Sequence, residues 1–396
     1  MPDSDALRID ILLPALFEGS GGLRTVVALA DDLAEAGFNV HIHVEVDESK
    51  PRKHQPPRDV QRELSELYGL HRAAAHLGWP QRLPDSAVIV ATAWFSVVAV
   101  STIVSPARRF YFVQDYEPMF LPRGDLQLAA EASYEAGLET IVIGSWLRDH
   151  LRERHGVAAD SVPFTADLTL YTDTGNAATP TRHRVVALYQ PEKPRRCAGL
   201  LSLALRDCMA ATPDLEVVTF GSADGPHLGG NHRHVGLLPR RKLPALYRSA
   251  TVGVALSATN TSRVPFEMMA CGLPVVDLDL SSNAANLPRA GSVLAKPNPS
   301  SLAGSILEVL GNPERRDALS RGGRDFMSQR PHPLEGATFV DIVRQRLLAP
   351  APAPRAADEG TLPWHPTYAR MASEQATFSR KFARRVAKAL NARLDP

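Results

Sequence analysis

The stretch GVALSATNTSRVPFEMMACGLPVVD, residues Gly253–Asp277, decides the fold. It begins as an apolar strand, passes through a polar loop at 257–263, forms a short helix that ends at Gly272, and starts a second strand at Pro274. A buried strand, a helix closed by glycine and another buried strand make up the unit of a parallel α/β sheet. Glu267 falls on the first turn of this helix, near the edge where open α/β sheets bind ligands. Its carboxylate could accept hydrogen bonds from the paired hydroxyls of a sugar, or it could be a solvated acid at a helix start, which the helix dipole also favours.

The segment PFEMMACGLPVVD resembles the donor-binding segment of GT-B glycosyltransferases in the GT4 group. In that group the second Glu of a Glu-x7-Glu motif holds the ribose of a nucleotide-sugar, and Glu267 matches this second Glu. The first Glu would fall on Thr259. This departure is similar to the WsaF-type rhamnosyltransferase branch, whose loop is rich in small polar residues before Pro-x-Glu-Met. The resemblance implies that Ser262 and Arg263, in the same loop, also contact the donor.

The length and composition limit the class of protein. A chain of 396 residues suits two domains of ordinary size. A formal net charge of +1 gives no basic field for nucleic-acid binding. The three cysteines lack metal-ligand spacing, and their odd number suits a reducing compartment. The N-terminus has no basic leader, and no apolar run approaches the roughly 20 residues of a membrane span, so we expect a soluble, cytoplasmic protein.

The N-terminal part begins with a βαβ unit. A buried strand at Arg8–Leu13 leads through a glycine-rich turn into an amphipathic helix, and a second strand follows at Asn39–Val44. Gly21 and Gly22 could serve a tight turn, or could let a ligand approach the backbone at the helix N-terminus. The resemblance favours the second interpretation, since this loop faces the interdomain cleft in GT-B enzymes. Further strands are predicted at 87–92, 109–114, 139–143 and 216–221, and helices at 62–77, 300–310 and 313–330.

Polar residues gather where the strand at 109–114 ends, in Gln114-Asp115-Tyr116-Glu117-Pro118. This motif also resembles the WsaF-type branch. Asp115 or Glu117 could orient an acceptor hydroxyl or assist its deprotonation. The alternative is a strand-end Asp that caps the following turn.

The C-terminal part opens with a strand at Arg184–Tyr189, followed by Gln-Pro-Glu-Lys-Pro-Arg-Arg and an apolar helix. Lys193, Arg195 and Arg196 therefore lie between a strand end and a helix N-terminus. Free N–H groups and guanidinium forks in that position suit a diphosphate, whereas a solvated basic turn is the alternative. The resemblance assigns donor phosphate binding to a basic pair here, and we favour Arg195 and Arg196.

A glycine- and histidine-rich loop is predicted at 222–234. Its histidines have no neighbouring carboxylate, so we interpret them as surface residues and not as a metal site. The resemblance places the backbone of Gly236–Leu238 near the nucleotide base and so includes Gly236 and Leu238 in the donor site. A polar turn is expected at 281–290.

The last residues form a linker and a basic tail. Residues 349–366 are rich in Pro and Ala. Residues 373–394 carry an apolar stripe at four-residue spacing, and six basic side chains and no acid lie between Phe378 and Leu394. This helix could lie on the anionic inner face of the plasma membrane, or it could dock on the N-terminal domain.

We therefore predict an α/β protein of two Rossmann-like doubly wound domains facing a cleft, the GT-B architecture. The predicted domains are 1–165 on the acceptor side, 166–348 on the donor side, and 349–396 as linker and tail. The resemblance implies transfer of L-rhamnose from dTDP-L-rhamnose, as co-substrate, to a cell-surface glycan or glycolipid. Because Arg195 and Arg196 can neutralise the leaving diphosphate, we expect no metal, and we expect no cofactor. A UDP- or GDP-sugar donor, a non-catalytic sugar-nucleotide-binding subunit and an epimerase stay open as alternatives.

Overall fold

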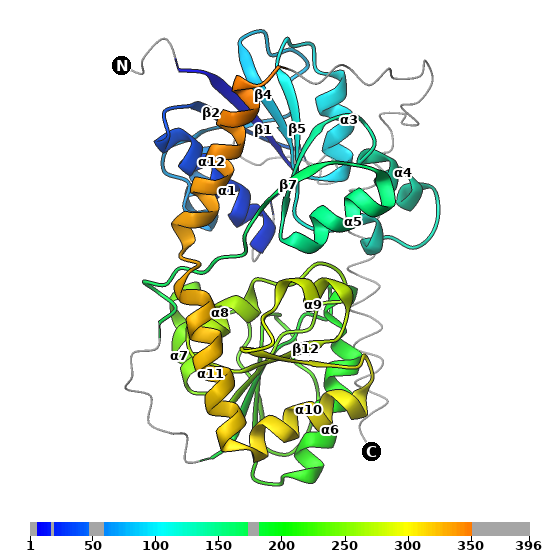
Figure 1. Ribbon diagram of the computed structural model, residues 1–396, viewed down its shortest axis with the longest axis vertical. Coiled ribbons are helices and arrows are strands. Elements are labelled where there is room, and N and C mark those ends of the chain that lie inside the picture. The colour runs from blue at the N-terminus through cyan, green and yellow to red at the C-terminus, as the bar shows by residue number, and fades with distance from the viewer. Residues whose placement is uncertain (1–5, 17–19, 47–58, 173–181, 351–396) are drawn as a thin grey trace, which may run out of the picture. The chain divides into compact units, whose positions relative to one another are not determined.

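The computed structural model describes residues 6–16, 20–46, 59–172 and 182–350 (Figure 1). These residues form two compact units. The first contains the chain up to Pro163 and continues from Pro333 onward, and the second is Phe164–His332. The predicted tail helix at 373–394 and nearly all of the linker before it lie outside the described residues.

The first unit is built on a seven-stranded parallel sheet in the order β3-β2-β1-β4-β5-β6-β7. The order runs outward in both directions from β1, as in doubly wound Rossmann folds. Helices connect the strands, so both faces can be covered, and the central strands are buried along most of their length. The strands are β1 (Arg8–Leu13), β2 (Asn39–Val44), β3 (Ala74–Leu77), β4 (Ser86–Ala91), β5 (Arg108–Val113), β6 (Glu139–Ile143) and β7 (Ala159–Val162). The helices are α1 (Gly21–Glu35), α2 (Val60–Tyr68), α3 (Trp94–Thr102), the 3-10 turn η1 (Glu117–Phe120), α4 (Asp125–Ser133), α5 (Ser145–His155) and α12 (His332–Leu348).

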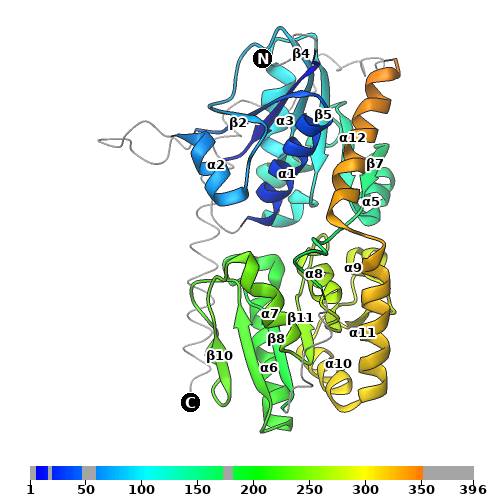
Figure 2. The same cartoon turned by 90° about the vertical axis from the view of Figure 1, so that its left-hand side faces the viewer.

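The second unit repeats the plan with a six-stranded parallel sheet in the order β10-β9-β8-β11-β12-β13, and β10 forms one edge (Figure 2). The strands are β8 (Arg184–Leu188), β9 (Glu216–Phe220), β10 (His232–His234), β11 (Val252–Val254), β12 (Val275–Leu278) and β13 (Ser292–Ala295). The helices are η2 (Pro194–Arg196), α6 (Ala198–Ala211), η3 (Arg240–Lys242), α7 (Leu243–Arg248), α8 (Val264–Ala270), α9 (Ser281–Asn286), α10 (Pro299–Gly311) and α11 (Pro313–Ser328). The predicted fold class, two Rossmann-like α/β domains, is confirmed.

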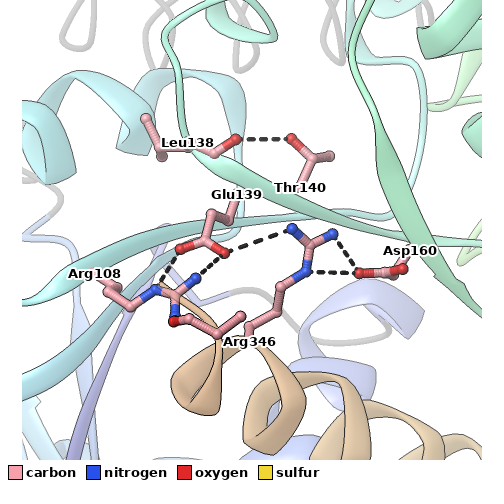
Figure 3. Close-up of polar contacts among 7 residues, drawn as sticks. Arg108, Leu138, Glu139, Thr140, Asp160 and Arg346 are labelled. Atoms are coloured by element: carbon pink, nitrogen blue, oxygen red, sulfur yellow. Dashed lines mark hydrogen bonds and ion pairs between the residues drawn. The ribbon is translucent and has the colours of Figure 1, made fainter. Parts of the chain in front are cut away.

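The helix α12 joins the first unit although it follows the second in sequence. The ring of Phe339 packs edge-on against Phe112 of β5, with the ring centroids 5.3 Å apart. Arg346 donates through Nε to Asp160 at 2.9 Å and pairs with Glu139, which also accepts from Arg108 Nε at 2.6 Å (Figure 3). The second unit therefore ends near His332, whereas the predicted donor-side domain extends to 348. The contacts that decide this are distant in sequence.

Several short elements differ from the predictions. The predicted helix at 62–77 is a helix only to Tyr68, where Gly69 closes it in a left-handed conformation, and β3 follows. The edge strands β7 and β10 and the helix α12 were not predicted, and the expected polar turn at 281–290 contains α9. In β10, His232 Nε2 and His234 Nδ1 each lie 2.9 Å from the Thr219 hydroxyl. These two histidines are therefore half-buried members of the sheet edge.

Candidate functional site

The candidate site in the second unit centres on the connection from β11 to α8. Gly253 allows α8 to pack closely on β11, because a Cβ there would lie 2.5 Å from the sulfur of Met268. Pro265 stands in the first turn of α8, where its missing N–H is harmless. Gly272 follows the helix with φ +75°, a left-handed conformation that suits glycine. These features fix the half-buried Glu267 on the first turn of α8.

Two buried tyrosines lie close to Glu267. The hydroxyl of Tyr247 donates to Glu267 Oε2 at 3.3 Å, and the Tyr247 ring stacks with Tyr171, with centroids 6.1 Å apart. Burial, assisted by the Glu267 charge, raises the pKa of both phenols, which therefore stay neutral at physiological pH. The guanidinium of Arg240 lies over the Tyr171 ring at 5.6 Å and pairs with Asp167 at 3.0 Å. The hydroxyl of Tyr247, whose ring stacks on Tyr171, thus positions the carboxylate of Glu267.

The polar loop before α8 is buried and hydrogen-bonded internally. Ser257 donates through its hydroxyl to the Asn260 carbonyl at 2.6 Å. From α9, Asn283 Nδ2 donates to the Ser257 carbonyl at 3.0 Å and its Oδ1 accepts from Thr261. Asn286 donates to Asn260 Oδ1 at 3.2 Å. Small polar side chains of the loop and of α9 thus hold in place the loop that carries Ser262 and Arg263, which were predicted to contact the donor.

The structure brings the predicted basic residues against this loop. Arg195 and Arg196 form η2, between β8 and α6, and both are half-buried. The Arg195 carbonyl accepts from Ala258 N at 2.9 Å, and Arg196 Nη1 donates to the Leu256 carbonyl at 3.4 Å. Two segments about 60 residues apart in sequence therefore meet at the carboxyl edge of the second sheet.

The N-terminus of α6 adjoins the two arginines. Its N-cap residue, Cys197, has φ +49° and makes no side-chain cap. It is the one non-glycine residue with positive φ in the described part of the chain. A first turn without a side-chain cap keeps backbone N–H groups for an anion, and guanidinium groups beside it strengthen that preference. Chemically this corner suits phosphate.

A buried acid lies behind the arginines. Asp277, at the end of β12, accepts through Oδ1 from Ser257 N at 3.0 Å and from Leu278 N at 2.7 Å. Its Oδ2 is buried without a hydrogen-bond partner among the described residues. Burial raises the pKa of Asp277 to about 7, although those two N–H groups and the charge of Arg196 act in the opposite direction.

The other predicted donor residues lie in loops and turns of the second unit and are buried to different degrees. Ser262 is buried, and its hydroxyl accepts from Val264 N at 3.4 Å at the start of α8. The carbonyl of Arg263 accepts from Glu267 N at 3.2 Å. Lys193 is the half-buried N-cap residue of η2. Gly236 follows β10 with φ +71°, and its carbonyl accepts from Gly221 N at 2.9 Å, while Leu238, two residues on, is half-buried.

The four predicted residues of the first unit lie at the carboxyl ends of β1 and β5. Gly21 and Gly22 open α1, and a Cβ on Gly22 would lie 3.3 Å from the Gln114 side chain, so the two predicted loops meet there. Asp115 Oδ1 accepts from the next backbone N–H at 2.9 Å. Glu117 accepts from Trp94 N, at the start of α3, at 2.6 Å. Asp115 thus makes the local turn contact of the alternative interpretation, whereas Glu117 bonds the first residue of α3, which was not predicted.

Sequence reasoning missed Tyr171, Tyr247, Asp277 and Asn283 as parts of the site. Only the position of Asp277, an acid ending an apolar strand, offered a signal. Within the described ranges, no group of three or more His, Cys, Asp or Glu side chains could hold a metal ion. No described helix is both long and apolar enough to cross a membrane.

Comparison with known proteins identifies a matching family model and a curated relative. Residues 183–307 match the family model of the WsaF C-terminal domain, and this range includes η2, the polar loop and α8. The O-antigen biosynthesis protein RfbC of Myxococcus xanthus is 30% identical over 275 residues, which are 67% of this chain and 21% of that protein. The chain therefore spans about a fifth of the length of this curated relative.

Solved structures resemble the fold at low identity. Sucrose-phosphate synthase from Thermosynechococcus elongatus has a TM-score of 0.66 at 16% identity, covering 87% of this chain and 100% of the other. Anabaena HepE in complex with UDP and glucose also has a TM-score of 0.66, at 14% identity, covering 86% of this chain and 99% of the other. WaaG, a glycosyltransferase involved in lipopolysaccharide biosynthesis, has a TM-score of 0.56 at 14% identity, covering 85% and 99%. The chain has the GT-B fold of these proteins, and its second domain is similar to the C-terminal domain of WsaF.

Proposed function

We propose that the protein is a glycosyltransferase that transfers a sugar from a nucleotide-activated donor during the biosynthesis of O-antigen or another polysaccharide. The observation that carries this proposal is the meeting of Glu267 and the Arg195–Arg196 pair around one loop of the second unit. A carboxylate can bind a ribose diol, and cations can bind a diphosphate. Together these groups match the two halves of a nucleoside diphosphate. The name of RfbC and the UDP complexes of HepE support the same class.

Each group has a defined task in this proposal. Glu267 accepts hydrogen bonds from the ribose hydroxyls, and Tyr247 keeps its carboxylate in place. Arg195, Arg196 and the first turn of α6 stabilise the diphosphate, whose negative charge increases as the glycosidic bond breaks. Because these cations can supply that stabilisation, we propose transfer without a divalent cation. Activity that persists in excess EDTA is the expected result.

For the donor we propose dTDP-L-rhamnose, on the basis of the similarity to WsaF, and a cell-surface glycan or glycolipid as the acceptor. A UDP- or GDP-sugar is the alternative donor.

A non-catalytic sugar-nucleotide-binding role is a second candidate, favoured by one observation. Thr259 occupies the position of the first Glu of the motif, where it is 3% exposed and brings no carboxylate to the site.

Thermal-shift measurements with dTDP, UDP, GDP and ADP test the proposal. A ligand at one hundred times its Kd should stabilise the protein by about 2.7 kcal/mol. We expect a shift with dTDP that is lost in Glu267→Gln and reduced in Tyr247→Phe. Asp279→Asn, which changes an exposed acid of the same unit, is the matched control. A selective shift with UDP or GDP would identify a different donor. Nucleotide binding without sugar transfer or hydrolysis would favour the non-catalytic role. The absence of a shift with every nucleotide would contradict nucleotide-sugar binding.

A further inference from the structure

Asp277 is a buried acid of the second unit to which the proposed transfer chemistry assigns no task. It stands near the carboxyl end of β12, an inner strand of the second sheet (Figure 1), and is 0% exposed. The backbone N–H groups of Ser257, at 3.0 Å, and Leu278, at 2.7 Å, both donate to Oδ1. Oδ2 is buried and has no hydrogen-bond partner among the described residues. Ionisation therefore places a charge on a buried carboxylate that is only half satisfied, which is unfavourable.

The basic corner proposed for the diphosphate lies beside this acid. Ser257, which donates to Asp277, directly follows Leu256, whose carbonyl accepts from Arg196 Nη1 at 3.4 Å. The Arg196 guanidinium is close enough for its charge to favour the ionised form of Asp277. Burial, followed by the charge of Asp277, raises the pKa of the Cys197 thiol, so this thiol is neutral at physiological pH and adds no charge. Asp277 and a bound diphosphate would therefore compete for the charge of one guanidinium.

Burial and the guanidinium act on Asp277 in opposite directions, and burial is the larger effect. Because burial raises the pKa of the carboxyl to about 7, about half of the molecules carry this proton at neutral pH. A diphosphate bound at Arg196 would bring negative charge near the carboxyl and offset the charge of the guanidinium. Both changes favour the protonated carboxyl. By thermodynamic linkage, a ligand that favours the protonated form binds more tightly at a pH where that form is populated.

We propose that Asp277 takes up a proton from solvent when the diphosphate of the donor binds, so that donor affinity falls as the pH rises above neutrality. Neutral Asp277 leaves the full charge of Arg196 to the diphosphate, whose negative charge increases as the glycosidic bond breaks. Asp277 is thus a positioning residue that acts through Arg196 and not by contact with the donor. The identification of the ligand as a nucleotide-sugar rests on the proposed function, whereas proton uptake with a diphosphate does not.

Isothermal titration calorimetry on the full chain tests this inference, with dTDP-L-rhamnose, UDP-glucose, GDP-mannose and inorganic pyrophosphate as probes. Titrations in two buffers of different ionisation enthalpy give the number of protons taken up on binding. The diphosphate of a nucleotide-sugar is esterified at both ends, so the ligand itself does not titrate near neutral pH. The wild-type protein should take up about 0.5 proton at pH 7 and about 0.9 proton at pH 8 with the nucleotide-sugar that it binds. The Kd should rise about tenfold from pH 6 to pH 8.

Asp277→Asn keeps an oxygen that can accept the two backbone hydrogen bonds but cannot take up a proton. This variant should bind the same ligand without proton uptake, and its Kd should not change between pH 6 and pH 8. Asp279→Asn is the matched control, since Asp279 is an exposed acid that pairs with Arg289 at 3.5 Å, and it should behave as the wild type. Pyrophosphate titrates by itself, so the difference in uptake between the wild type and Asp277→Asn isolates the carboxyl. If Asp277→Asn does not fold, the wild-type uptake with a nucleotide-sugar decides alone.

The outcomes separate this inference from the proposed function. Nucleotide-sugar binding without proton uptake at pH 8, or with equal uptake by Asp277→Asn, would overturn the inference and leave the proposed function standing. Pyrophosphate binding with uptake that Asp277→Asn lacks would support the inference, and the absence of binding by every nucleotide-sugar would then contradict the proposed function alone. The absence of binding by all four probes would overturn both.

Discussion

Asp277 is a buried carboxylate whose two oxygens differ in their surroundings. Oδ1 accepts two backbone hydrogen bonds and Oδ2 has none within the described part of the chain. Because burial raises its pKa to about 7, the folded protein retains a proton that the unfolded chain releases near pH 4. Wild-type stability should therefore fall as pH rises from about 4 to about 7 and then level off.

Asp277→Asn should remove this dependence. The variant should gain stability relative to the wild type as pH rises from about 4 to about 7, by at most about 4 kcal/mol at about 1.4 kcal/mol per pH unit. Urea unfolding at pH 5 and pH 8 measures the difference. Asp279→Asn, at an exposed acid two positions further on, should show no such trend. Equal destabilisation of Asp277→Asn at both pH values would show that the hydrogen bonds of the carboxylate matter and its charge does not.

Single residues also mark the limit of what the sequence predicts about the site. Glu267, Arg195 and Arg196 are recognisable because each stands at a strand–helix junction, where parallel sheets bind ligands. Tyr247, Tyr171 and Asn283 are not recognisable, because their importance lies in contacts with residues 20 or more positions away. Glu117 shows the reverse. Its acidic side chain and its position after a strand suit catalysis, yet its carboxylate accepts a hydrogen bond from the backbone N–H of Trp94 at the start of α3.

The elements follow the sequence where apolar periodicity is strong. Seven strands were predicted within one residue of their bounds, because most of their side chains are buried: β1, β2, β4, β5, β6, β8 and β9. The edge strand β3 has only four residues, Ala-Ala-His-Leu, and the edge strand β10 reads His-Arg-His, so neither is long or regular enough to show a strand pattern. The helix α9 reads Ser-Ser-Asn-Ala-Ala-Asn, which favours a turn, and it is held by its bonds to the polar loop.

The packing of α8 on β11 gives a prediction at the level of elements. Gly253→Ala would place a Cβ 2.5 Å from Met268 Sδ and 2.9 Å from Leu273, so α8 must shift. We expect a loss of about 1–3 kcal/mol in the free energy of unfolding and weaker nucleotide binding, since Glu267 moves with the helix. Gly304→Ala, inside α10 with no atom within 4 Å, should instead stabilise by about 0.4–1 kcal/mol. Chemical denaturation and thermal shift with nucleotide measure both effects, and an unchanged affinity in Gly253→Ala would argue against the role of Glu267.

At the scale of the molecule, the chain forms two successive Rossmann-like units, and the helix α12 belongs to the first unit although it follows the second in sequence. Strand–helix alternation predicts the two units, because each must cover both faces of a parallel sheet. The return of α12 to the first unit is not predictable from its own sequence. Its apolar residues would suit either sheet, and only the positions of Phe112, Glu139 and Asp160 select the first.

Hydrogen exchange can test whether α12 stabilises the first unit specifically. Phe339 is 2% exposed against Phe112, so Phe339→Ala should destabilise this unit by about 3–5 kcal/mol. We expect faster amide exchange in β5, β6 and β7 and unchanged exchange in β8 and β9, since the first unit would open more often than the second. Leu348→Ala, at the end of the same helix and 88% exposed, should leave both sheets unchanged. Equal loss of protection in the two sheets of Phe339→Ala would mean that the units unfold together and that α12 does not belong energetically to the first.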